Sequence, residues 1–237
     1  MGKFRTKYVS PIGLATYKSR RRCRDLMNHR GAWTQIRVNR FARRPIRIVV
    51  GASGDSFSGW ITTEKFFFDI TDRRSTSALI GGAKVRSFLL EHVLEHLSYE
   101  HATEAIKNLL RYVAAGGTIR IAVPDGNHPD EKYRRLVGVG GPDDHLHLWT
   151  SADAVVLARE SKCALEMVEY FTEGGQFVST HLSDSETIAE DRGLVSRSAK
   201  NSWSRADSKD YGPFGYTSLI FDLVADPLTT SGTATDL

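Results

Sequence analysis

The sequence predicts an α/β fold built on a doubly wound, mostly parallel sheet with helices on both faces. From residue 45 onward, apolar segments typical of buried strands alternate with segments of helical periodicity. In addition, the small-residue turn 51–54 directly follows the first apolar segment, and acidic residues stand at later strand ends. In such sheets ligands bind beyond the carboxyl ends of the strands, where a glycine turn admits a nucleoside and an acid holds its ribose.

The strands are expected where short runs of apolar and β-branched residues are bounded by glycine, proline or charged residues. Arg47 interrupts the first run, and Pro124 ends the fifth because proline cannot donate to a sheet ladder. The expected strands are 46–50, 60–64, 66–68, 85–90, 118–123, 165–171 and 217–224.

Helices are expected between these strands. Residues 91–115 have helical periodicity with a break at 98–100, which predicts two helices, the second capped by Ser98. The glycine pair at 116–117 is expected to end the second helix, and Ser151 is expected to cap a later one. The remaining segments are predicted to be a short helix or turn at 72–82, a long loop at 124–148 and mostly irregular chain at 172–215.

Charge divides the chain unevenly. Residues 1–44 hold 13 Lys and Arg against the single acid Asp25, whereas the rest of the chain holds 19 Lys and Arg against 27 acids. We therefore expect a basic N-terminal extension at 1–44, one folded domain at 45–226 and a disordered tail rich in Thr and Ser at 227–237.

Composition also restricts the compartment. No apolar run reaches the roughly 18 residues that span a bilayer, and the N-terminal region has no apolar stretch of the signal-peptide kind. Cys23 and Cys163 lie far apart and match no metal-binding spacing, so we interpret them as thiols of a reducing compartment. A cytoplasmic protein without a transmembrane segment is expected.

The basic extension has two interpretations. It is either a solvated or partly helical segment that packs a few apolar residues on the domain, or a binding segment for a phosphate-rich partner. That partner would be an anionic lipid headgroup or nucleic acid, and arginine clusters alone do not distinguish the two. In the lipid case the protein would be peripheral at a membrane.

The glycine turn bears on the choice of cofactor. It is not a GxGxxG motif, because Ser53 replaces the second glycine, and the residues between Gly54 and Trp60 are too few for a regular crossover helix. A dinucleotide needs a helix N-terminus behind this turn for its pyrophosphate, whereas S-adenosylmethionine has no phosphate. Glu64 is then a candidate ribose ligand, and Asp69 is either an adenine or sugar ligand or a turn acid.

A second motif at the end of the fourth strand allows two interpretations. Residues 92–96 match H-x-x-E-H, a zinc-hydrolase signature when it lies on a helix, with Glu169 or Glu173 as a possible third ligand. However, the motif directly follows a buried strand at the mouth of the sheet. We therefore favour a cofactor-lining strand end, with no metal and with His96 as a helix residue packing against the domain.

Several segments together resemble a bacterial protein family. GWITTEKFFFDIT, EHVLEHL, LLRYVAAGGTIRIAVPDGNHPD, PDDH, GQF and GYTSLIFD occur in the family's order and spacing. On these motifs, residues 45–225 resemble the predicted class I S-adenosylmethionine-dependent methyltransferases with a GW…D second strand and an EHxxEHL fourth-strand motif. The resemblance implies a Rossmann-like sheet of seven strands, the last of them antiparallel, with S-adenosyl-L-methionine as cofactor.

The resemblance also implies roles for individual residues. Gly51, Ala52 and Ser53 would hold the methionine portion and Glu64 the ribose. Asp69 and Ile70 would flank adenine, and Glu91 and His92 would line the methyl side. The chain departs from the family at Glu64, where Asp is usual, at 115–117, where the turn is usually PGG, and at 162–163, where Gly-Phe is usual.

Candidates for acid–base chemistry lie in the long loop 124–148. His145, in the PDDH segment, is the first candidate for a general base, with Asp144 to orient it, and His128 with Asp125 is the second. For each histidine a loop-stabilising hydrogen bond is the alternative.

The sequence therefore predicts a methyltransferase that modifies an O or N atom of a small-molecule or glycan-like acceptor. Two alternatives stay open: an NAD-type Rossmann oxidoreductase, and a non-catalytic binding module anchored through the basic extension.

Overall fold

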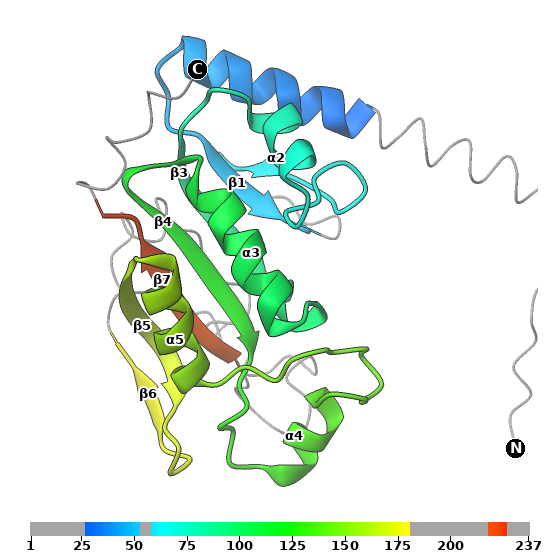
Figure 1. Cartoon of the computed structure of the whole chain (residues 1–237), viewed down its shortest axis with the longest axis vertical. Helices are drawn as coiled ribbons and strands as arrows, with labels where there is room; N and C mark the ends of the chain where they lie inside the picture. Colours follow the sequence, from blue (N-terminus) through cyan, green and yellow to red (C-terminus); the bar gives the residue numbers. More distant parts are fainter. Residues whose placement is uncertain (1–26, 53–57, 181–217, 227–237) are drawn as a thin grey trace, which may run out of the picture.

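The computed structural model describes residues 27–52, 58–180 and 218–226, and its centre is a seven-stranded sheet (Figure 1). The strand order is β2-β1-β3-β4-β7-β5-β6. The strands are β1 (Arg47–Val50), β2 (Ile61–Thr62), β3 (Val85–Glu91), β4 (Val113–Pro124), β5 (Ala164–Phe171), β6 (Phe177–Ser179) and β7 (Ser218–Val224).

The strand directions agree with a Rossmann-like sheet. β2, β1, β3 and β4 are parallel neighbours, whereas β7 is antiparallel to both β4 and β5, and β6 is antiparallel to β5. The predicted α/β class, a sheet of seven strands and the antiparallel last strand are confirmed, although β6 takes the place of the strand expected at 66–68. Because β1, β2 and β3 are parallel, their carboxyl ends lie at one edge of the sheet.

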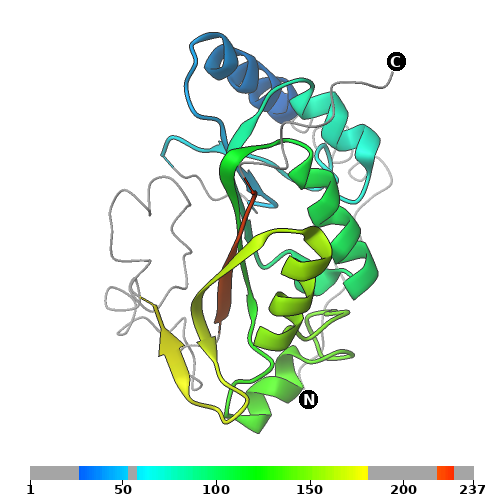
Figure 2. The same cartoon turned by 60° about the vertical axis from the view of Figure 1, so that its left-hand side comes forward.

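Helices were expected on both faces of the sheet; within the described residues they cover one face (Figure 2). The main hydrophobic core lies between that face and α2, α3, α5 and an N-terminal helix at 27–41. A smaller cluster, including Val49, Leu89 and Ile220, lies on the opposite face. The labelled helices are α2 (Arg73–Ile80), α3 (Tyr99–Leu110), α4 (Glu131–Val137) and α5 (Ser151–Ser161), with a 3₁₀ turn η1 at Leu94–His96.

The N-terminal helix belongs partly to the core. Ala32 and Ile36 are buried in the main cluster, while Trp33 stays partly exposed with the guanidinium of Arg37 3.3 Å from its ring centroid. The predicted division of the chain at residue 44 stays a prediction, and residues 1–26 and 227–237 lie outside the described part. No helix among the described residues is both long and apolar enough to cross a membrane.

The expectations for residues 66–68 and for the helix 91–115 are wrong. A turn at 65–67 replaces the strand expected at 66–68, because the amides of Phe67 and Phe68 donate to the carbonyl of Glu64. The helix expected to run to residue 115 ends at Leu110, and the glycine pair 116–117 lies inside β4. A Cβ at Gly117 would come within 2.7 Å of the Arg86 carbonyl oxygen, so this glycine permits close approach of β3.

Local hydrogen bonds account for the helix starts. Ser98 caps α3 as predicted, by accepting from the amide of His101. α5 is capped by Thr150, one residue earlier than expected, in a capping box with Asp153. α4 lies in the segment expected to be a loop, and its N-cap is Asp130, whose carboxylate accepts the amides of Lys132 and Tyr133.

Candidate functional site

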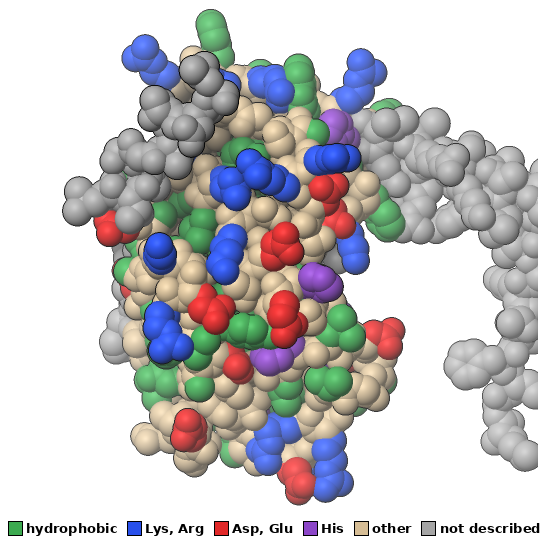
Figure 3. Space-filling view, viewed as in Figure 1, with side chains coloured by type: hydrophobic (Ala, Val, Ile, Leu, Met, Phe, Trp, Pro, Cys, Tyr) green, Lys and Arg blue, Asp and Glu red, His purple; other side chains and the backbone are tan. Residues whose placement is uncertain are grey.

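A pocket of about 610 Å³ lies at the carboxyl ends of β1 and β3 and along the segment after β2. Figure 3 shows a hollow at the right-hand edge of the face in view, with acidic and histidine side chains beside it. The lining combines a glycine, acids, histidines and apolar side chains: Val50, Gly51, Glu64, Lys65, Phe66, Phe68, Asp69, Ile70, Thr71, His92, Val93, His96, Leu97 and Asp144.

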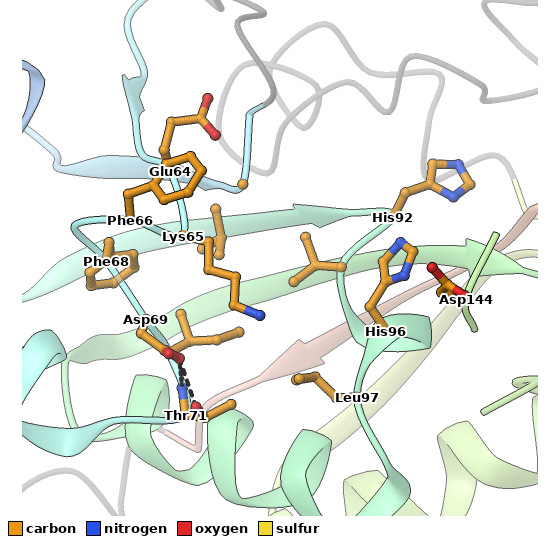
Figure 4. Close-up of a pocket in the computed structure, with 14 residues that line it drawn as sticks. Glu64, Lys65, Phe66, Phe68, Asp69, Thr71, His92, His96, Leu97 and Asp144 are labelled. Atoms are coloured by element: carbon orange, nitrogen blue, oxygen red, sulfur yellow. Dashed lines mark hydrogen bonds between the residues drawn. The ribbon is translucent and has the colours of Figure 1, made fainter. Parts of the chain in front are cut away.

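The pocket has two chemically different ends (Figure 4). Glu64 and Asp69 lie at one end with the aromatic rings of Phe66 and Phe68, and the side chains of His92, His96 and Asp144 gather at the other. Its volume lies within the range of small-molecule and cofactor sites, about 300–1,000 Å³.

Gly51 provides close access to backbone where β1 ends. Its φ is 64°, a left-handed conformation that favours glycine, and it lines the pocket. A Cβ at this position would meet Cγ2 of Val93 at 3.3 Å. Any side chain here would therefore both strain the backbone and occupy space that belongs to the pocket.

Glu64 reaches the pocket because β2 is tied to β1 beyond its short ladder. The amide and hydroxyl of Thr63 both donate to the carbonyl of Val49, at 2.9 and 2.8 Å, and the amide of Ala52 donates to the carbonyl of Thr63 at 2.9 Å. Thr63 is fully buried, and these bonds hold the next residue, Glu64, beside Gly51.

Asp69 combines the two roles that the sequence left open. Its Oδ1 accepts the amide of Thr71 at 2.9 Å and the hydroxyl of Thr71 at 2.7 Å, which is the geometry of a turn acid. The same residue lines the pocket, and within the described part of the chain its Oδ2 makes no hydrogen bond. Oδ2 is therefore available to a ligand.

Apolar side chains complete the lining of the pocket. Phe68 and Ile70 are buried, whereas the ring of Phe66 is 61% exposed. Val93 and Leu97 add to this lining from the segment after β3. An exposed aromatic ring beside two acids suits a nucleoside. The base can stack on the ring, while the sugar hydroxyls and the amino group of the base bind the acids.

The end of β3 is conformationally special. His92 has a φ of 55°, a conformation that costs a residue other than glycine of order 1–3 kcal/mol and that recurs at functional sites. Its amide still pairs with the carbonyl of Ala122 in β4 at 2.9 Å. Its Nδ1 lies 2.8 Å from Oε1 of Glu95, which fixes the direction of the ring.

Two residues assigned to the cofactor by resemblance are not among the lining residues, and a third is not described. Ala52 is buried in the smaller core cluster, and Ser53 lies outside the described residues. Glu91 is the last residue of β3 but is not among the lining residues. Leu90, the residue before Glu91, faces the main core on the pocket side. Because successive strand residues point to opposite faces, the side chain of Glu91 is directed away from that side.

The three catalytic candidates divide into two groups. Asp144, with a φ of 55°, lines the pocket. His145 is buried directly behind it and packs its ring against His96, with ring centroids 4.9 Å apart. His145 was expected to be oriented by Asp144. Its Nδ1 instead lies 2.8 Å from the carbonyl oxygen of Val137.

His128 lies away from the pocket. Its ring is buried against Tyr133 and Phe171, and its Nδ1 accepts the amide of Asp130. Asp125 does not pair with the His128 side chain either, because its two oxygens accept the amides of Asn127 and Phe171. Burial raises the pKa of Asp125 to about 6, against the lowering effect of those two bonds. This geometry favours the structural alternative for His128.

Sequence reasoning missed part of the lining. Lys65 and Phe66 directly follow the predicted ribose acid, and their position could have indicated them; Phe66 was instead expected to begin a strand. His96 was expected to pack on the domain, yet its side chain is exposed and lines the pocket. The signal for His96 was present in the H-x-x-E-H motif, although its histidine neighbour proves to be His145.

Comparison with known proteins gives similarity of fold alone. No protein-family model matches the chain, and no curated protein is significantly similar to it. Similar solved structures include an O-methyltransferase family protein from Burkholderia thailandensis, with 16% identity and a TM-score of 0.36 over 62% of this chain and 56% of that one. This chain therefore spans little more than half the length of that protein.

Two further structures are similar over most of their length. A SAM-dependent methyltransferase from Archaeoglobus fulgidus has 11% identity and a TM-score of 0.42, with 80% of this chain and 90% of that one covered. The magnesium protoporphyrin IX methyltransferase of Synechocystis PCC 6803, solved with bound SAH, has 9% identity and a TM-score of 0.38, with 84% and 83% covered. Similarity this low supports no argument about activity, so the function is inferred from the pocket.

Proposed function

We propose that the chain is an S-adenosyl-L-methionine-dependent methyltransferase acting on an O or N atom of a small-molecule or glycan-like acceptor. One observation carries this proposal. A positive-φ glycine, two acids and an exposed aromatic ring meet in one pocket beyond the carboxyl ends of parallel strands.

The residues present fit this cofactor. The place that a Cβ of Gly51 would fill suits the close approach of the methionine portion. Glu64 is suited to accept the two ribose hydroxyls, and the free Oδ2 of Asp69 to accept from the ribose or from the adenine amino group. Phe66 supplies a stacking face for the adenine ring. The carboxylates also favour the positive charge of the sulfonium.

The histidine end of the pocket would then be the acceptor side. When bound, the cofactor supplies an electrophilic methyl group for an in-line displacement. The chain must align the acceptor with it and, for a hydroxyl, remove a proton. His92, His96 and Asp144 line this end, and His145 lies behind His96. Nδ1 of His145 is held by the Val137 carbonyl, so its Nε2 carries the available lone pair.

The oxidoreductase alternative is less favoured. A nicotinamide dinucleotide carries a pyrophosphate, which is usually bound at a helix N-terminus directly after β1. Only ten residues, 51–60, connect β1 to β2, which is at the lower limit for a crossover that contains a helix. Titration with NAD under the same conditions separates the two classes.

The test is a calorimetric titration of the purified chain with S-adenosyl-L-methionine and with its demethylated product. We expect binding of the intact chain and a loss of about 10- to 100-fold in affinity for Glu64→Ala, since hydrogen bonds to a charged group contribute about 1.5–3 kcal/mol. Glu104→Ala is the matched control, because it removes the same charge from an exposed position on α3.

Each outcome has a defined meaning. Binding that is weakened in Glu64→Ala but not in Glu104→Ala supports both the cofactor and the pocket. Absence of binding to the intact, folded chain would contradict the proposed function. The non-catalytic binding module would then be the better description, and salt-dependent binding to anionic vesicles or nucleic acid would test it.

A further inference from the structure

Three metal-ligating side chains meet at the histidine end of the pocket. Glu95 and His96 come from the 3₁₀ turn η1, and His145 from the loop between α4 and α5. One potential ligand atom from each of these residues lies within 4.8 Å of the other two. From the sequence no metal was expected here. The H-x-x-E-H motif at 92–96 pairs His96 with His92, whereas this cluster pairs it with His145.

Glu95 is the least expected member of this cluster. Its side chain is only 1% exposed. Oε1 is paired with His92, but Oε2 is buried and has no hydrogen-bond partner among the described residues. Burying a carboxylate oxygen without a partner is costly, and such an atom in a folded protein calls for an explanation such as a bound ion.

His145 is oriented as a metal ligand. Its Nδ1 lies 2.8 Å from the carbonyl oxygen of Val137. A carbonyl can only accept, so Nδ1 carries the hydrogen and Nε2 keeps a lone pair. A ligating histidine commonly donates its other ring N–H to a backbone carbonyl, which fixes the tautomer and the ring direction. His145 is also 6% exposed, so the ring is held by its surroundings.

Backbone bonds hold the two segments together. The amides of Leu146 and His147 both donate to the carbonyl oxygen of Glu95, at 2.8 and 3.3 Å. The loop after α4 is thereby attached to η1 at the very residue that carries the unpartnered carboxylate. His92, through its contact with Oε1, holds that carboxylate from the other side.

We propose that Glu95, His96 and His145 bind a divalent transition-metal ion at the acceptor end of the pocket. Two imidazoles and one carboxylate suit zinc, cobalt, iron or manganese and leave coordination positions open. Bonds of about 2.0–2.2 Å to the ion require ligand atoms about 3–4 Å apart. The exposed imidazole of His96 can supply this small movement, because the other two side chains are held.

The position of the ion gives it a role. This role, unlike the binding itself, rests on the proposed methyltransferase function. His96 and Asp144 line the pocket, so an open coordination position would face the acceptor. A metal ion lowers the pKa of an oxygen bound to it, and the hydroxyl proton of an acceptor would leave to water more readily. His92 is then a positioning residue that orients Glu95.

The binding test uses untagged protein treated with a chelator and then titrated with Co²⁺ or Zn²⁺ alone. Calorimetry and the visible absorption of Co²⁺ report binding without any methyl donor or acceptor. We expect one ion per chain, with affinity reduced at least 10-fold by His96→Ala and by Glu95→Gln. His101→Ala, which removes an exposed histidine from α3, is the matched control and should bind as the intact chain does.

His96→Ala is the decisive variant, because its side chain is exposed and its loss should leave the fold intact, as checked by circular dichroism. Failure of the intact chain to bind Co²⁺ and Zn²⁺, or binding that survives in His96→Ala, overturns the proposal. Titration with S-adenosyl-L-methionine is independent of this result, so loss of the metal proposal and loss of the proposed function are distinguishable.

Discussion

Gly51 combines two constraints at a single residue. Its left-handed backbone disfavours any side chain, and a Cβ would meet Val93 inside the pocket. We expect Gly51→Ala to lower the free energy of unfolding by about 1–2 kcal/mol, the usual cost of this conformation for an L-residue. We also expect it to weaken binding of S-adenosyl-L-methionine at least 10-fold. Chemical denaturation and calorimetry measure the two effects.

Gly59 provides a matched comparison for Gly51. It also has a positive φ, 77°, but a Cβ there would meet nothing within 4 Å, and it does not line the pocket. Gly59→Ala should therefore lose similar stability while keeping its affinity for the cofactor. Equal affinities of the two variants would show that the space at Gly51 is not used by the ligand.

At the level of elements, a buried ion pair joins β7 to β4 in addition to their backbone ladder. Nε and Nη2 of Arg120 in β4 donate to Oδ1 and Oδ2 of Asp222 in β7, each at 2.8 Å. The two residues are direct cross-strand partners, and both side chains are nearly inaccessible to solvent. A bidentate pair of this kind holds the antiparallel strand in one register between β4 and β5.

This pair leads to a prediction about stability. Arg120→Met should lower the free energy of unfolding by about 3–5 kcal/mol, because it leaves the carboxylate of Asp222 buried without its charge partner. The double variant Arg120→Met, Asp222→Val should recover a large part of this loss, since no charge then remains buried. A urea denaturation series on both single variants and the double variant measures the coupling. Additive losses would mean that the two side chains do not act as a pair.

For the whole molecule, Asp125 links stability to pH. It is fully buried at the end of β4 and accepts the amide of Phe171 in β5, so it joins two elements of the sheet. Burial raises its pKa to about 6, whereas an unfolded aspartate titrates near 3.9. Between these two values the folded state therefore holds a proton that the unfolded state has lost.

The sign of the resulting pH dependence follows from this difference. Asp125 makes the free energy of unfolding fall as the pH rises from about 4 to about 6, by up to about 3 kcal/mol, and leaves it constant above that window. Denaturation of the intact chain and of Asp125→Asn across pH 4–7 should show this slope in the former only. The exposed Asp143→Asn is the control and should keep it. A slope that persists in Asp125→Asn would assign it to other groups.

Much of the fold follows from local patterns. Continuous apolar runs identify the buried strands, and helical periodicity with a capping serine identifies α3, because these signals depend only on neighbouring residues. The glycine pair at 116–117 shows the limit of such reasoning. Glycine is common both where a helix ends and where two strands approach closely. Only the packing of β3 against β4 shows which of the two applies here.

The pocket could likewise be predicted only in part from the sequence. Gly51, Glu64, Asp69 and His92 could be assigned from the sequence, because parallel strands place their carboxyl ends at a common edge. Three other features could not be predicted from the sequence: the left-handed backbone of His92, the burial of His128, and the contact of His96 with His145. They depend on how a long loop folds back over the sheet, for which no local period exists. The pairing of Arg120 with Asp222 likewise joins positions 102 residues apart, and the three-dimensional packing of the chain alone brings them together.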